Sequence, residues 1–430
     1  MYPAVYDHKV SSSDSLDRTG KLVVVAVFLA LTVDGMDFQM LALSLPSISK
    51  ELTLSTVSAG ALSTYTLLGM GGGGVLAGWL SDRIGRVRVV WWSVLTFSVL
   101  TGVVALCNTY MQIAVTRLVS GFGLGAVYSI GTLLAAEYVP TRMRGTLLGA
   151  MQGGWSAGYV IAALLSAWLL PAWGWRALFV CAILPGIVTL LLLWKIPDPP
   201  SWIVARNHAR NEAAGPSPFA RIWDDRSLRR TFLVWTVAAI ALQFGYYGAT
   251  SWLPSYLVKD LGVNVQNMGW YVAGTYTMTI GGKVVTGYLA DLIGRRATWI
   301  VAGLLTAVYL PLLVYSATPR NAAYLLLIFG FLYAAPYAVN STYLSESFPA
   351  GIRGTAVATS YSFGRIGSTL SPLLIGLAAS RYSIGLGIGL LGISYAICAL
   401  APGLFIREKM FDPNAVESAA TAYAPTTLTA

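Results

Sequence analysis

Long apolar segments are the feature that most limits what this chain can fold into. Residues 22–45, 178–194 and 386–406 carry few charged side chains, and 95–106 forms another apolar run with its flanks. A helix needs about 20 predominantly apolar residues to cross a bilayer. Charged residues make up 11% of the 430 positions, whereas a soluble domain carries roughly 25%. The sequence therefore predicts an all-α membrane protein.

The apolar pattern predicts twelve transmembrane helices. We place them at 22–45, 57–80, 89–107, 112–136, 145–169, 176–194, 231–257, 267–289, 297–316, 322–346, 354–379 and 384–406.

The distribution of basic residues predicts how these spans are oriented. Loops and tails on the side that contains the N-terminus hold 20 of the 28 Lys and Arg residues, the other side holds 5 when Arg176 at the first position of its span is counted there, and the other 3 lie within spans. Cytoplasmic loops carry such an excess. We therefore expect a multi-pass protein of the cell inner membrane with both termini in the cytoplasm. The net charge of +10 needs no nucleic-acid partner to explain it.

Metal, cofactor and nucleophilic chemistry have no signature in the sequence. Cys107, Cys181 and Cys398 lie in or beside apolar segments without metal or redox spacing, and His8 and His208 lie in polar stretches. We expect neither an enzyme nor a bound cofactor or metal, and we expect a monomer in the bilayer.

The two halves of the chain are related by a shift of 209 residues. The shift aligns Gly78, Asp82, Gly85, Arg86, Glu137 and Arg144 with Gly287, Asp291, Gly294, Arg295, Glu346 and Arg353. One constant shift over separated regions indicates a repeat of six helices, with both copies entering the membrane from the same side. The long polar segment between them predicts the division of the chain: a tail at 1–20, a first half at 21–196, a cytoplasmic linker at 197–230, a second half at 231–406 and a tail at 407–430.

A recurring motif follows the second helix of each half. It reads GWLSDRIGRVR from Gly78 to Arg88 and GYLADLIGRR from Gly287 to Arg296. This motif resembles the signature loop of the major facilitator superfamily, and the resemblance implies two parallel six-helix halves that transport by alternating access.

Ion pairs around this motif are expected to hold the cytoplasmic side shut and to break when it opens. Their alternative role is that of static salt bridges in a basic loop. The expected gate residues are Gly78, Asp82, Arg83, Gly85, Arg86, Glu137, Arg144, Asp291, Arg295, Glu346 and Arg353.

Arg117 on the fourth helix is a charged residue within a span and a candidate for a functional role. RLVSGFGLG, from Arg117 to Gly125, resembles a second superfamily motif, whose glycines allow close helix packing. Ionised groups inside a span are expensive and usually functional.

Two carboxylates on the first helix are candidates for proton coupling. Asp34 and Asp37 are three residues apart and share a helix face, and Arg117 reaches about the depth of Asp37. Burial favours the protonated form of a carboxylate and a neighbouring arginine favours the ionised form, which is the balance that a reversible proton site needs. The alternative is a structural Asp37–Arg117 pair that never titrates.

The Asp-Gly-x-Asp pattern from Asp34 to Asp37 resembles that of aromatic acid:proton symporters and their organic-acid relatives, including muconate-type transporters. Drug:proton antiporters of the superfamily carry a Gly-Pro pair in the fifth helix. The corresponding stretch here, from Gly149 to Tyr159, contains no proline.

Two further cations lie within spans of the second half. Arg365 falls near mid-membrane with no acidic residue of its own half at that depth, and its guanidinium fits a carboxylate. Its alternative is an arginine that reaches into a water-filled cavity. Lys283 lies about two turns from the cytoplasmic end of its span. From there it can either bind substrate or extend its ammonium group to the membrane surface, and the sequence favours neither role.

Aromatic and amide side chains complete the expected binding site, although any one of them could instead serve helix packing. They are Tyr128, Gln152, Trp155, Tyr159, Gln243, Tyr246, Tyr337, Asn340 and Tyr361. Such walls suit a flat, partly apolar organic acid.

The sequence therefore predicts a proton-coupled symporter that imports a small organic acid anion, an aromatic acid or an unsaturated dicarboxylate such as muconate. Its rivals are proton-driven efflux of a drug or metabolite, and a membrane sensor that binds an organic acid without moving it.

Overall fold

Helices form all the regular structure in the part of the chain described by this computed structural model, residues 16–139, 141–199 and 218–407. The first half contains α1 (Arg18–Glu51), α2 (Thr56–Ile84), α3 (Arg86–Val104), α4 (Tyr110–Tyr138), α5 (Thr141–Cys181) and α6 (Ile183–Leu193). A short helix, α8 (Pro218–Asp224), precedes the second half. That half contains α9 (Arg226–Ser255), its π-helical extension η1 (Tyr256–Asp260), α10 (Val265–Ile293), α11 (Arg295–Ser316), α12 (Ala322–Tyr333), α13 (Ala335–Ser345), α14 (Ala350–Arg381) and α15 (Ile384–Phe405).

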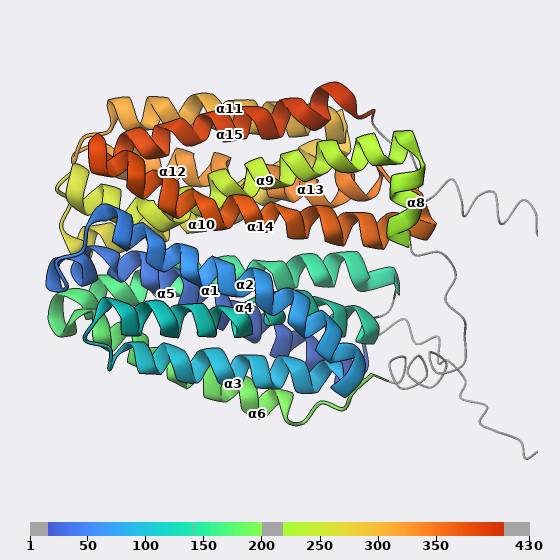
Figure 1. Ribbon diagram of the computed structural model, residues 1–430, viewed down its shortest axis with the longest axis horizontal. Coiled ribbons are helices and arrows are strands. Elements are labelled where there is room, and N and C mark those ends of the chain that lie inside the picture. Colours follow the sequence, from blue (N-terminus) through green and yellow to red (C-terminus); the bar gives the residue numbers. More distant parts are fainter. Residues whose placement is uncertain (1–15, 140, 200–217, 408–430) are drawn as a thin grey trace, which may run out of the picture.

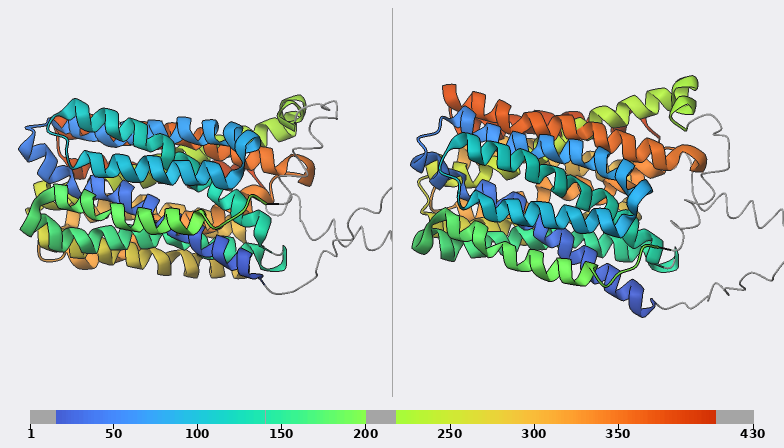
Figure 2. Two further views of the ribbon diagram at one scale, coloured as in Figure 1. Left: turned by 90° about the horizontal axis from the view of Figure 1, so that it is seen from below. Right: turned by 60° about the horizontal axis from the view of Figure 1, so that its bottom comes forward.

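The helices of each half form a bundle, and the two bundles lie side by side with their long axes parallel (Figure 1). The start of α1, helix α8 and the end of α15 all lie at one end of the molecule (Figures 1 and 2), which we call the terminal end. The other end is called the opposite end. Contacts between the halves run through α2 with α14, α5 with α10, and α1 with α9.

Helix length and composition agree with the number of membrane spans expected from the sequence. Eight helical segments of the described chain are long and apolar enough to cross a membrane. One of them, Gly153–Leu193, contains two of the predicted spans. The predicted spans 57–80, 267–289 and 354–379 correspond to α2, α10 and α14, whose many Gly, Ser and Thr residues lower their mean hydropathy. Together the described helices account for the twelve predicted crossings.

Three spans differ in detail from their prediction. The fifth and sixth run on from one another, and the chain turns at Gly174, whose φ of 74° lies in the left-handed region that glycine tolerates. The tenth is divided into α12 and α13 at Ala334, two residues before Pro336. Proline has no N–H to donate, so the helix ladder is interrupted there.

The repeat seen in the sequence is confirmed in the packing. A Cβ atom added to Gly73 would lie 2.1 Å from the carbonyl oxygen of Phe122, and one added to Gly282 would lie 2.0 Å from that of Phe331. Both glycines and both phenylalanines are separated by 209 residues. Gly85 and Gly294, another equivalent pair, both have positive φ, at 109° and 95°, where the second helix of each half ends.

The two halves are packed tightly at the opposite end. A Cβ on Gly60 of α2 would lie 2.4 Å from the carbonyl oxygen of Pro372, and a Cβ on Gly269 of α10 would lie 2.7 Å from the backbone nitrogen of Ala167. Gly60 and Gly269 are themselves equivalent positions. Backbone therefore meets backbone across both interfaces between the halves.

The terminal end is more open. Gly78 and Gly287 lie in the last turns of the same two helices, and a Cβ added to either would meet no described atom within 4 Å. The same is true of Gly281, and of Gly153 on α5. The described residues therefore show backbone contact between the halves at the opposite end, and free space around these four glycines nearer the terminal end.

Candidate functional site

Asp37 and Arg117 form a buried ion pair in the first half. The Arg117 guanidinium donates to both carboxylate oxygens, at 2.9 and 3.1 Å, and the hydroxyl of Thr101 on α3 also donates to Asp37. Both charged side chains are at most 1% exposed. The guanidinium carbon lies 4.9 Å from the ring centre of Phe179, which covers it on one side. The structure thus brings this predicted pair together and adds Thr101 as a donor.

Asp34 lies one turn earlier on α1 in a different setting. Its side chain is completely buried, and neither carboxylate oxygen accepts a hydrogen bond from the described residues. Asp37 and Arg365 are the charged groups that interact with it electrostatically. Burying an ionised carboxylate without donors is costly, and a proton or a cation relieves that cost.

Arg365 lies on α14 beside the first half, with its Cβ 4.0 Å from the position that a Cβ on Gly71 of α2 would take. Its guanidinium lies 3.4 Å from the hydroxyl of Tyr247 on α9, and it interacts electrostatically with Tyr128 and Asp34 of the first half. Within the described residues, no carboxylate lies within ion-pair distance of Arg365. The guanidinium therefore has donors left for a further anion.

Lys283 faces the other interface between the halves. Its ammonium nitrogen on α10 lies 3.4 Å from the hydroxyl of Ser156 on α5, and the side chain is half-buried. The described chain places no carboxylate within ion-pair distance of it either.

Aromatic rings line the region between these charged groups. Tyr128 stacks on Tyr361 with ring centres 6.2 Å apart and meets the edge of Trp155 at 6.2 Å. Trp155 in turn contacts Tyr159 at 5.8 Å. These rings come from α4, α5 and α14, so they join the two halves.

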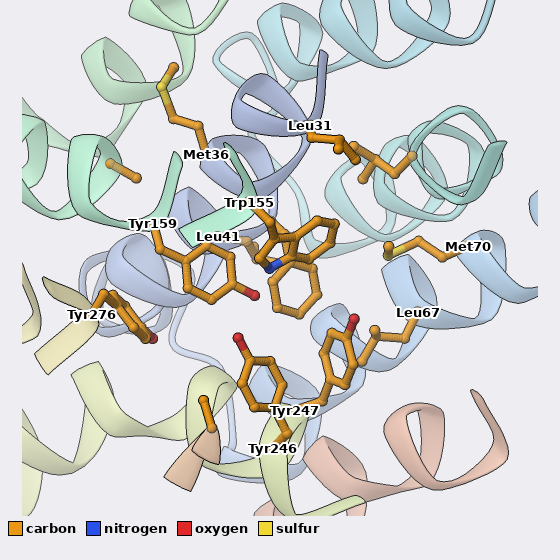
Figure 3. Packing of buried hydrophobic residues seen from close by; sticks show 14 of the residues in the cluster. Leu31, Met36, Leu41, Leu67, Met70, Trp155, Tyr159, Tyr246, Tyr247 and Tyr276 are labelled. Atoms are coloured by element: carbon orange, nitrogen blue, oxygen red, sulfur yellow. The ribbon is translucent and has the colours of Figure 1, made fainter. Parts of the chain in front are cut away.

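A second set of rings lies beside the first. Tyr246 stacks on Tyr333 at 5.1 Å and contacts Tyr337 at 4.9 Å, while Tyr159 contacts Tyr276 at 4.7 Å. Figure 3 shows the hydroxyls of Tyr159, Tyr246 and Tyr247 directed into the space where α5 and α9 face each other. Hydroxyl groups on aromatic walls suit a ligand that is both flat and polar.

Three other residues were predicted for the binding site, and their surroundings differ. Gln243 donates its amide to the carbonyl oxygen of Tyr361 at 2.8 Å, which ties α9 to α14. Asn340 is buried on α13. The side chain of Gln152 lies outside the described residues.

Equivalent ion pairs lie at the terminal end of each half. Arg86 pairs with Glu137 at 2.8 Å, and Arg295 pairs with Glu346 at 3.6 Å. Arg295 also pairs with Asp291 one turn before it. These pairs join the start of the third helix of each half to the end of its fourth, so each lies within one half.

The other predicted gate residues have different surroundings. The Arg83 guanidinium carbon lies 3.7 Å from the ring centre of Trp79, and Arg353 donates to the carbonyl oxygen of Phe348 at 3.1 Å. The side chains of Asp82 and Arg144, two more of the expected gate residues, lie outside the described residues.

A further charged cluster at the opposite end was not predicted. Glu51 at the end of α1 accepts hydrogen bonds from Trp175 at 2.7 Å and from Arg176, with which it forms an ion pair at 2.7 Å. These interactions lower the pKa of the Glu51 carboxyl, Trp175 contributing most. Its equivalent in the second half, Asp260, accepts from the backbone nitrogen of Gly385, which is the position equivalent to Arg176.

Thr101 and Phe38 of the central region were not among the predicted site residues. Thr101 has no feature that distinguishes it from other threonines in spans. Phe38 and Tyr247 contact each other edge to face with ring centres 5.5 Å apart. They are separated by the repeat shift of 209 residues, so the repeat could have singled them out as residues that meet at its axis.

The arrangement has the parts of an ion-coupled binding site. A buried carboxylate without donors, a guanidinium with donors to spare and a set of tyrosine hydroxyls lie where the two halves meet. A sequence model of the Major Facilitator Superfamily matches residues 27–323 and 256–428, which together span most of the chain.

This chain belongs to the major facilitator superfamily. It is therefore a multi-pass membrane transporter and not an enzyme, as the sequence analysis predicted.

Three named transporters are similar to this chain over most of their length. The cis,cis-muconate transport protein of Acinetobacter baylyi is 47% identical over 399 residues, which cover 92% of this chain and 97% of that protein. The probable 4-methylmuconolactone transporter of Cupriavidus pinatubonensis is 29% identical, with 85% of each chain covered. The gentisate transporter of Corynebacterium glutamicum is 28% identical, with 87% of this chain and 85% of that protein covered.

Solved transporter structures share the fold. A D-xylose–proton symporter superposes with a TM-score of 0.74 at 20% identity, covering 91% of this chain and 98% of that chain. The inward-open conformation of the xylose transporter of Escherichia coli also gives 0.74, at 19% identity, with 91% and 97% covered.

Proposed function

We propose that the protein is a proton-coupled symporter that imports a small organic acid anion across the cell inner membrane. The observation that carries this proposal is the position of Arg365, a cation within a span that faces tyrosine hydroxyls and the buried Asp34 of the other half. Transporters of muconate and gentisate among the relatives support an organic acid as the cargo.

The substrate carboxylate would bind to the Arg365 guanidinium. A guanidinium can donate two parallel hydrogen bonds to a carboxylate, and such charge-assisted bonds are the strong ones. The rings of Tyr128, Trp155 and Tyr361 would contact the flat organic part of the substrate. Tyr247 already occupies one donor of Arg365, which fixes the orientation of the guanidinium plane.

Asp34 would carry the coupled proton. When Asp34 is ionised it competes with the substrate for Arg365, and when it is protonated that competition ends. Substrate and proton would therefore enter together, and loss of the proton would weaken the hold of Arg365 on the substrate. Asp37, held by Arg117 and Thr101, would keep α1 in register and add its negative charge to the field around Asp34.

The basic loops support placing the terminal end in the cytoplasm, with both chain termini there. The state described above, closed at the opposite end, would then be open to the cytoplasm. Residues 21–196 and 231–406 would move against each other as two bodies within a monomer, joined by the segment 197–230. The terminal ion pairs Arg86–Glu137 and Arg295–Glu346 would stiffen each body, while Asp82 and Arg144 would take part in closing the cytoplasmic side.

Uptake of labelled acids into proteoliposomes tests this function. Benzoate, protocatechuate, cis,cis-muconate and lactate would each be supplied with and without an inward proton gradient. We expect one acid of this set to accumulate in a gradient-dependent way, and Arg365→Ala to abolish its accumulation. Unchanged uptake by Arg365→Ala would remove the binding role of Arg365. Gradient-driven loss of a preloaded cationic drug, without uptake of any acid, would indicate efflux instead.

A further inference from the structure

Lys283 is a charged residue within a span, and the proposed proton coupling gives it no role. Its ammonium group crosses to the other half and contacts the Ser156 hydroxyl at 3.4 Å. A neutral hydroxyl at that distance compensates little of the cost of removing an ammonium ion from water. A second anion near Ser156 would compensate it.

The repeat places Lys283 opposite Arg365. Ser156 and Arg365 are 209 residues apart and are therefore equivalent positions of the two halves. An axis along the membrane normal keeps equivalent positions at the same depth. Because the ammonium group lies against Ser156, it lies close to the depth at which Arg365 leaves α14, on the other side of the axis. The contact between Phe38 and Tyr247 marks where that axis passes.

Aromatic rings connect the two cations. Trp155 precedes Ser156 on α5 and contacts Tyr128, which stacks on Tyr361. Arg365 follows Tyr361 by one turn of α14 and interacts with both tyrosines electrostatically. The rings of Trp155, Tyr128 and Tyr361 therefore form a line between the residue next to Ser156 and the residue one turn before Arg365.

We propose that Lys283 is a second carboxylate-binding residue, and that with Arg365 it selects a dicarboxylate whose charges are joined by a flat unsaturated chain. This inference rests on the proposed function, because it assumes that Arg365 binds the first carboxylate. The unsaturated chain would lie along Tyr128 and Trp155, with one carboxylate at each end. A monocarboxylate would leave Lys283 without its partner.

Matched ligands and variants separate this role from a structural one. The ligands are cis,cis-muconate and its monomethyl ester, which differ in one negative charge and keep the same diene. Lys283→Gln removes the charge at similar length, Lys283→Arg keeps it, and Lys259→Gln removes a lysine charge at the opposite end as a control. Binding to the purified full-length protein is measured by quenching of tryptophan fluorescence, and size-exclusion chromatography checks that each variant is folded.

We expect the wild-type protein and Lys259→Gln to bind the dianion more tightly than the ester. Lys283→Gln should weaken binding of the dianion by roughly 10- to 100-fold, the worth of a hydrogen bond between charged groups, and leave binding of the ester unchanged. Lys283→Arg should restore the preference for the dianion. Arg365→Gln should weaken both ligands.

Two results would overturn the role of Lys283. One is equal affinity of Lys283→Gln and wild type for the dianion. The other is an equal loss for both ligands that Lys283→Arg does not restore. If Arg365→Gln weakens a ligand while Lys283→Gln does not, the proposed function stands and this inference fails. If neither ligand binds the wild-type protein, the proposed function itself fails for these acids.

Discussion

Phe38 and Tyr247 are equivalent residues of the two halves, and their rings touch with centres 5.5 Å apart. Residues related by the repeat can meet only near its axis, so this contact locates the axis on α1 and α9. Asp34 lies one turn before Phe38, and Arg365 contacts the ring and the hydroxyl of Tyr247. The proposed proton site and the proposed substrate site therefore lie on either side of one contact between the halves.

Asp34→Asn should separate exchange from accumulation. Asparagine keeps the shape of the side chain and cannot release a proton, so gradient-driven accumulation of the acid should be lost. Exchange of labelled for unlabelled substrate across the membrane needs no net proton movement and should persist. Counterflow and gradient-driven uptake in the same proteoliposomes measure the two activities. Normal accumulation by Asp34→Asn would show that the proton is carried elsewhere.

Asp37→Asn should act on stability more than on coupling. The substitution leaves the fully buried Arg117 without its ion-pair partner, and breaking a buried pair costs about 3–5 kcal/mol. The thermal midpoint in detergent should fall well below that of wild type. Thr101→Val removes one donor to Asp37 and should cost roughly 1 kcal/mol, so its midpoint should fall less. An unchanged midpoint for Asp37→Asn would show that the pair does not stabilise the fold.

Ionisation of Glu51 should make the thermal stability of the first half depend on pH. Hydrogen bonds from Trp175 and Arg176 lower the pKa of its carboxyl below the ordinary value of 4.5. Because the pKa is lower in the folded state, the ionised carboxyl stabilises the fold. This stabilisation is complete above the pKa of the unfolded chain, and it is lost as the pH falls through the pKa of the folded protein. The thermal midpoint of wild type should therefore approach that of Glu51→Gln below about pH 4.5 and exceed it at pH 7. A constant difference at every pH would contradict this.

Gly269 should be required for closing the opposite end. A leucine there would collide with the backbone of Ala167 on α5, which cannot move aside as a flexible side chain can. Gly269→Leu should therefore hold the halves apart at this end. A Cβ added to Gly287, on the same helix, meets no described atom within 4 Å, so Gly287→Leu should leave the opposite end closed.

The readout for these two variants is a cysteine at Thr64, whose hydroxyl bonds to the carbonyl oxygen of Thr369 across the α2–α14 interface. With the native cysteines replaced, a membrane-impermeant maleimide added to the opposite side should label this cysteine faster in Gly269→Leu. Equal labelling in both variants would show that the contact at Gly269 does not control closure.

The fold was predictable from the sequence because two strong patterns agree. Apolar length predicted the spans, and the shift of 209 residues predicted two equivalent bundles, which Gly73 and Gly282 confirm in the packing. The boundaries were less predictable. A glycine such as Gly174 turns a helix only where its φ is positive, and many other glycines of this chain lie inside straight helices.

The charged residues of the site were predictable, because placing an ionised group inside the membrane costs free energy. Asp37, Arg117, Arg365 and Lys283 stood out because ionised groups are rare within spans. Contacts between uncharged side chains from different helices, such as Thr101 with Asp37, depend on helix rotation, which the sequence pattern does not determine.

Proton symport requires that protons move into the vesicle together with the substrate. Proteoliposomes containing a pH-sensitive dye would receive cis,cis-muconate outside with no imposed proton gradient. We expect the interior to become more acidic when the acid is added, and to show no such change with Asp34→Asn or Arg365→Ala. Uptake of the acid with no change of internal pH, or with alkalinisation, would contradict proton symport.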